Sequence, residues 1–114
     1  MKSYLYLSQS EKGKLAISSY VFVQIALQTL KELSEDELKG SFVYDEKGKK
    51  MNASSDVDKD GKVTINISVT GYSGTNMQIV SKEIQEKVYE NVTEMFEIGN
   101  ITVNVMILGM QEKK

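Results

Sequence analysis

The sequence contains no histidine, cysteine, tryptophan, proline or arginine among its 114 residues. Without cysteine the chain can form neither disulfides nor thiolate metal sites. Without histidine it lacks the side chain that most often acts as a general acid or base near neutral pH. A serine nucleophile would have only lysine or a carboxylate as its base, and no such pair stands in a recognisable arrangement. We therefore predict no enzymatic activity, no catalytic residues and no cofactor.

Positive charge is carried by 14 lysines, and the net charge is −2. Lysine lacks the planar fork with which arginine grips a phosphate or a guanine edge at two points. A surface that binds nucleic acid is expected to be basic. The composition therefore disfavours a nucleic-acid partner.

Long hydrophobic runs are also absent. The longest apolar run, Tyr20–Leu27, is interrupted by Gln24 and falls far short of the ~20 residues that span a bilayer. The first residues, MKSYLYLSQSEKGK, hold too few apolar side chains for a secretory signal. We expect a cytoplasmic protein without a membrane span, whose only route to a membrane is a partner protein.

Hydrophobic periodicity divides the chain into short elements, separated by polar or glycine-containing segments. The predicted order is a strand at Leu15–Ile17, a helix at Ser19–Leu33 capped by Ser18 or Ser19, a strand at Ser41–Asp45, a polar loop or hairpin tip at Glu46–Lys62, a strand at Val63–Val69, a helix at Asn76–Phe96 and a strand at Ile101–Ile107. An extra N-terminal strand at Tyr4–Leu7 is left open.

This β-α-β-β-α-β order predicts an α+β fold. Each strand offers one apolar face and each helix one apolar stripe, such as Val80, Ile84, Val88, Val92 and Met95 in the second helix. We predict a two-layer sandwich in which two helices cover one face of a mostly antiparallel four-stranded sheet. The chain has the length of one domain, residues 1–114 with a core at 13–109.

Three alternating carboxylates, Asp56, Asp58 and Asp60, followed by Gly61, match the opening of a calcium-binding loop. The position that should hold a bidentate glutamate is Ile67, and no helix precedes the motif. A solvated turn explains the same residues, because Asp-Gly favours chain reversal. No metal site is predicted, and calcium binding stays open as an alternative.

The face of the sheet turned away from the helices is the most distinctive predicted surface. It would carry small uncharged side chains: Thr64, Asn66, Ser68, Thr102 and Asn104. Since no charge there would keep molecules apart, we select these five as interaction candidates, with an ordinary hydrated sheet face as the alternative. RNA-recognition domains share the predicted element order, but they stack bases on aromatic strand residues. Here only Tyr44 falls in a predicted core strand, so an RNA-binding module is the second choice.

Three segments in order carry a family resemblance. They are GKLAISSYVFVQIA at 13–26, VTINISVTGY leading into MQIVSKEIQEKVYENVTEM at 63–95, and ITVNVMILG at 101–109. The last contains Val103, Asn104, Val105 and Gly109 in a V-N-V-x-hydrophobic-x-G pattern. Together they resemble the alkaline shock protein family of envelope stress proteins from Gram-positive and related bacteria.

The resemblance implies a non-enzymatic adaptor or scaffold of cell-envelope homeostasis. Well-known members of that family lie beneath the cytoplasmic membrane through a membrane-anchored partner and self-associate. By this resemblance we expect a protein partner, membrane-anchored in some settings, and a homo-oligomer. The family offers no catalytic residues to carry over.

Overall fold

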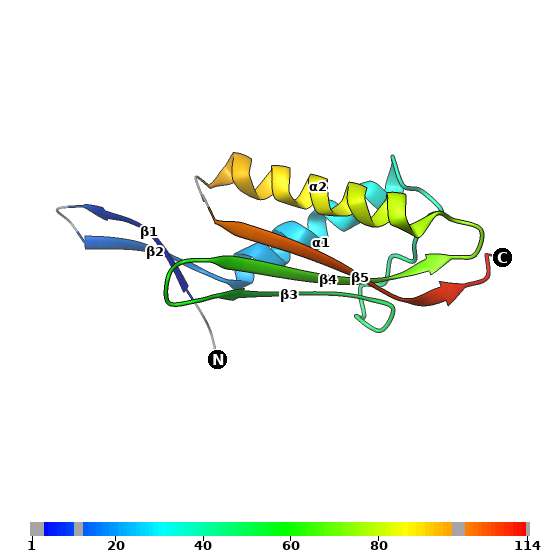
Figure 1. Cartoon of the computed structure of the whole chain (residues 1–114), viewed down its shortest axis with the longest axis horizontal. Helices are drawn as coiled ribbons and strands as arrows, with labels where there is room; N and C mark the ends of the chain where they lie inside the picture. The colour runs from blue at the N-terminus through cyan, green and yellow to red at the C-terminus, as the bar shows by residue number, and fades with distance from the viewer. Residues whose placement is uncertain (1–3, 11–12, 97–99, 114) are drawn as a thin grey trace.

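The computed structural model describes residues 4–10, 13–96 and 100–113. Its elements are β1 (Tyr4–Ser10), β2 (Gly13–Ser18), α1 (Tyr20–Glu35), β3 (Met51–Val57), β4 (Val63–Tyr72), α2 (Met77–Met95) and β5 (Ile101–Gln111). The fold is α+β, as predicted, and both helices lie within two residues of their predicted bounds. The molecule is elongated, 57 × 26 × 19 Å, since the β1–β2 ribbon projects beyond the layers formed by the other elements (Figure 1).

The main sheet has three strands in the order β3-β4-β5. β3 and β4 are antiparallel, whereas β4 and β5 are parallel. The predicted four-stranded, mostly antiparallel sheet is therefore wrong in number and direction. The parallel pair arises because α2 carries the chain back along the sheet, so that β5 starts beside the start of β4 (Figure 1). There the Val63 amide donates to the Asn100 carbonyl over 3.0 Å.

The strand predicted at Leu15–Ile17 forms, as part of β2, but it does not join this sheet. It pairs antiparallel with β1, the N-terminal strand that the sequence left open, in a separate two-stranded ribbon. The two strands are neighbours in the chain, so their pairing closes a much shorter loop than pairing with the main sheet would.

The segment between α1 and β4 departs most from the prediction. Ser41–Asp45 is not a strand; only Phe42 makes an isolated bridge, to Gly71. The strand β3 lies instead within the predicted polar loop. Its Cα register runs from Met51 opposite Val69 to Val57 opposite Val63. Alternation continues across it, since Met51 and Val57 are buried while the intervening even-numbered residues are exposed.

The core lies between the helices and one face of the sheet. Every residue of the predicted alternating set in β4 is buried, as are Val80, Ile84, Val88 and Val92 of α2. Met95, which was assigned to the same stripe, is 66% exposed because it lies at the end of the helix. The rings of Phe22 and Phe96 meet edge to face, 5.8 Å apart, and close one end of the core.

The start of α2 is fixed by Asn76. Its side-chain oxygen accepts hydrogen bonds from the amides of Gln78 and Ile79. These are two of the amides that a helix start leaves without partners. At α1, Ser19 is the capping residue but makes no such side-chain bond, and the Ser18 hydroxyl accepts from the Tyr20 amide instead.

Candidate protein-interaction surface

The sheet face opposite the helices is formed by alternate residues of β3, β4 and β5, and we call it the open face. The strand register arranges it in rows across the three strands: Asn52, Ser68 and Met106; Ser54, Asn66 and Asn104; Asp56, Thr64 and Thr102. The structure thus brings the five residues selected from the sequence, Thr64, Asn66, Ser68, Thr102 and Asn104, onto one continuous face. It does so even though the number of strands and their pairing differ from those predicted.

The centre of the open face holds a hydrogen-bonded pair. The side-chain amide of Asn104 donates to the side-chain oxygen of Asn66 over 3.0 Å, and both residues are exposed. This bond leaves the Asn66 amide group as a donor and the Asn104 oxygen as an acceptor for water or for a partner. The two remaining groups are a donor and an acceptor, so the pair can hydrogen-bond to the same pair of a second copy related by a twofold axis.

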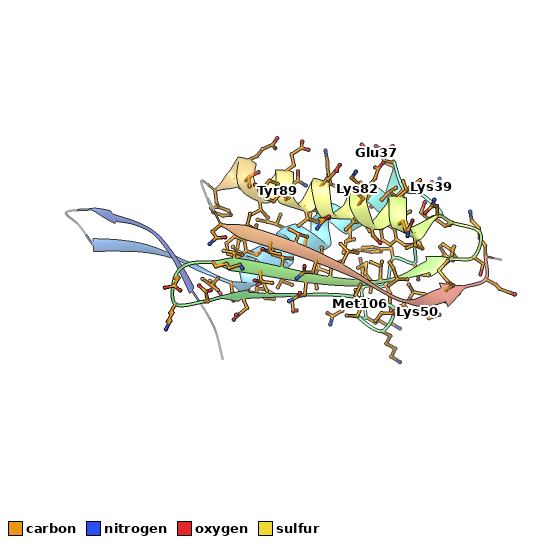
Figure 2. The ribbon with its side chains drawn as sticks, in the orientation of Figure 1. Glu37, Lys39, Lys50, Lys82, Tyr89 and Met106 are labelled. Carbon is orange, nitrogen blue, oxygen red and sulfur yellow. The ribbon has the colours of Figure 1, made fainter. Side chains whose placement is uncertain are left out.

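Two apolar residues on β5 were missed by the sequence analysis. Met106 is 63% exposed and shares a row with Ser68, and Leu108 is 51% exposed at the irregularity that follows Ile107. In Figure 2 the labelled Met106 lies on the side of β5 away from α2. Alternation from Thr102 and Asn104 onward could have found Met106, whereas Leu108 depends on the register shift between Val69 and Thr70.

Charge lies at the margins of the open face. Among its row residues only Asp56 is charged, and it stands at the end next to the β3–β4 turn. At the opposite end, the Lys50 ammonium donates to the Gln111 side-chain oxygen, which holds this lysine against β5 (Figure 2). A partner that binds across the middle rows therefore desolvates no ionised group of the open face.

Of the three aspartates at which calcium binding was left open, Asp58 and Asp60 lie in the β3–β4 turn, whereas Asp56 lies in β3. One carboxylate oxygen of Asp58 accepts the amides of Asp60 and Lys62, each over 2.9 Å, and Gly61 takes a positive φ of 82°. Within the described ranges there is no group of three acidic, histidine or cysteine side chains placed to hold a metal ion. The geometry of Asp58 and Asp60 fits the solvated-turn interpretation.

The aromatic residues of the main sheet give little support to the RNA-binding alternative. Tyr44 lies outside the strands, and the aromatic residue that the main sheet does contain is Tyr72, at the end of β4. The middle rows of the open face thus offer no ring on which a base could stack.

Two neighbouring groups in the turn before β3 have displaced pKa values. Burial, followed by the negative charge of Glu46, raises the pKa of Tyr44. Hydrogen bonds from the backbone amide of Lys50, and then of Lys47 and Lys49, lower the pKa of Asp45. The carboxylate of Asp45 accepts all three over 2.8–3.0 Å and thereby shapes the turn.

Comparison with known proteins adds no family assignment. No protein-family model matches the chain, and no curated protein is significantly similar to it. In the part of the chain that the structure describes, neither helix is both long and apolar enough to cross a lipid bilayer.

Proposed function

We propose that this protein is a non-enzymatic adaptor that acts through protein–protein contact, and that its open face binds a second copy of the chain. The observation that carries the proposal is the uncharged centre of that face, where the Asn66–Asn104 pair leaves the Asn66 amide group to donate and the Asn104 oxygen to accept. Scattered charges on a sheet face would resist the close approach of a second copy, and the middle rows of the open face carry none.

Packing of two open faces would bury the exposed side chain of Met106 and the small threonine and serine side chains around it. The apolar part of this contact supplies free energy, and the asparagine pair supplies orientation. A twofold arrangement uses the same surface on both molecules, so one patch is sufficient for a closed dimer.

The resemblance to alkaline shock proteins supports a role in cell-envelope stress or homeostasis. In this proposal the protein is cytoplasmic, and it reaches the membrane through an anchored partner rather than through a span of its own. A tagged copy should then recover a membrane-anchored protein from the membrane fraction of its native host. Recovery of nuclease-sensitive RNA in its place would contradict the adaptor assignment and favour an RNA-binding module.

Self-association is tested by placing charge at the centre of the open face. The double variant Asn66→Lys with Asn104→Lys should reduce the mass in light scattering to that of the 12.8 kDa chain. Each new ammonium would be desolvated opposite another one, which is unfavourable. The matched control, Ser73→Lys with Gln78→Lys, adds the same charge at exposed positions outside the face and should keep the wild-type mass.

Circular dichroism must show the same helix content in both variants. A wild-type mass of one chain at all concentrations would reject self-association. A lysine variant with an unchanged wild-type oligomer mass would reject the open face as the interface.

A further inference from the structure

A second surface lies on the opposite side of the molecule, between α1 and α2. One wall is formed by α1 residues Val21, Ile25 and Glu32, and the other by α2 residues Lys87 and Met95. The hollow between them has a volume of about 540 Å³. We call this hollow, together with the adjoining one lined by Glu32, Leu33, Asp36, Glu37 and Lys87, the interhelical groove. The two helices run antiparallel along it, because Met95 lies by Val21 and Ile25 whereas Lys87 lies by Glu32 and Asp36.

The floor of the groove is closed by a polar contact between the helices. The Asn91 amide donates to the Thr29 hydroxyl over 2.9 Å, and this hydroxyl donates to the Ile25 carbonyl over 2.7 Å. Thr29 is only 2% exposed, and a buried hydroxyl without a hydrogen-bond partner would destabilise the fold. These two bonds supply its partners. The hydroxyl of Thr29 at the floor is therefore hydrogen-bonded within the protein, and a ligand in the groove would contact mainly the walls.

The two ends of the groove differ in chemistry. One end presents apolar side chains, with Val21 and Ile25 half-buried and Met95 66% exposed. The other end is acidic, with Glu32, Asp36 and Glu37 around Leu33. Val21 and Ile25 are four residues apart, the spacing with which a helix presents side chains to a helix beside it.

The groove carries more negative charge than the chain as a whole. Its lining includes four carboxylates, those of Glu32, Asp36, Glu37 and Glu94, and one ammonium, that of Lys87, for a net charge of −3. The whole chain carries only −2, so the remaining surface is slightly positive. Lys87 is itself 4.0 Å from Glu90. The groove thus attracts a cationic partner and repels an anionic lipid surface.

We propose that the interhelical groove receives an amphipathic helix from a partner protein, with lysine or arginine along its polar side. Such a helix inserts apolar residues between Ile25 and Met95 and places basic residues over Glu32 and Asp36. This is helix-in-groove recognition, in which apolar anchors recur every three or four residues. The helices of a second copy do not fit, because the charged side chains of both are net acidic, two carboxylates to one lysine on α1 and four to two on α2.

The test uses two synthetic helical peptides of 18 residues with the same leucine stripe, one with lysine and the other with glutamate at the polar positions. Backbone amide shifts of the labelled protein are followed by NMR during titration. The lysine peptide should shift amides along α1 and α2 that line the groove, and it should bind more weakly when sodium chloride is raised from 50 to 500 mM. The glutamate peptide should cause no such shifts.

Two variants locate the contact. Glu32→Gln with Asp36→Asn should weaken binding of the lysine peptide by roughly three- to ten-fold, because two exposed charge pairs are lost. Met95→Ser should weaken binding at any salt concentration, with little effect on the fold, because this side chain is mostly exposed. The matched control Glu46→Gln with Glu83→Gln removes two exposed carboxylates outside the groove and should leave affinity unchanged.

Three results would overturn the proposal: no binding of the lysine peptide, equal binding of both peptides, or shifts confined to the open face. These outcomes are independent of self-association, which is read from the mass of the open-face variants. A negative result for peptide binding therefore does not contradict the proposed dimer, and a monomeric wild type does not contradict the proposed peptide binding.

Discussion

The two faces of β4 differ sharply in burial. Toward the helices, Val63, Ile65, Ile67 and Val69 are at most 1% exposed, whereas on the open face Asn66 is exposed and its neighbours Thr64, Ser68 and Thr70 are half-buried. The buried set fixes the register, since a slip by one residue would exchange the two faces. The open-face residues contribute little to fixing the register, so their identity is less constrained by folding.

The largest effect is expected on the buried face. Ile67→Ala should lower the free energy of unfolding by about 2–5 kcal/mol, because it removes a side chain that is 1% exposed and leaves a cavity. The adjacent change Asn66→Ala, on the open face, should cost less than about 1 kcal/mol, since it removes one exposed hydrogen bond. Urea unfolding followed by circular dichroism measures both. Equal losses of unfolding free energy in the two variants would show that both faces of β4 contribute equally to stability.

A smaller effect is expected where the buried face meets the start of α2. A Cβ added at Gly71 would lie 2.5 Å from the sulfur of Met77, so Gly71→Ala should destabilise the chain by about 1 kcal/mol, the low end for overpacking, because the flexible Met77 side chain can move aside. Shortening the obstructing side chain by Met77→Ala in the same molecule should recover part of that loss. The control is Gly109→Ala on β5, where a Cβ meets nothing within 4 Å. Strictly additive losses from Gly71→Ala and Met77→Ala would contradict the clash.

The sequence predicted β4 but missed β3, although the two strands pair over seven positions. Periodicity methods detect alternation between apolar and polar residues. β4 alternates valine or isoleucine with threonine, serine or asparagine, whereas the helix-facing positions of β3 include Ala53 and Ser55. The Ser55 hydroxyl donates to the Ser19 carbonyl, so this position is satisfied by a tertiary bond that no local pattern contains.

Strand order was also beyond the sequence pattern. Alternation identifies which residues share a face, and this holds for either strand direction. The five selected residues therefore lie together on the open face even though β5 is parallel to β4. The interhelical groove was not predicted, because its two walls, Val21–Glu32 and Lys87–Met95, are 55 or more positions apart in the chain and meet only through the packing of α1 against α2.

The smallest effect is expected at Asp45, whose carboxylate orders the turn that leads into β3. In Asp45→Asn, one carboxylate oxygen becomes an amide group that cannot accept a backbone hydrogen bond. The turn should loosen, but β3 should keep its register, because Met51 and Val57 are buried on the helix side. The open face would then remain intact, and the variant should keep the wild-type mass in light scattering.

The lowered pKa of Asp45 sets the pH dependence of this effect. A carboxylate with a lower pKa in the folded state stabilises the fold above its unfolded pKa, about 4, and this contribution is lost as pH falls through the folded pKa. The difference in urea midpoint between wild type and Asp45→Asn should thus be present at pH 6 and shrink below about pH 4. Asp60→Asn, at an exposed carboxylate in the next turn, is the comparison. A difference that grows on acidification would show that the three amide bonds do not favour the ionised form, and the turn would have to be held by its backbone alone.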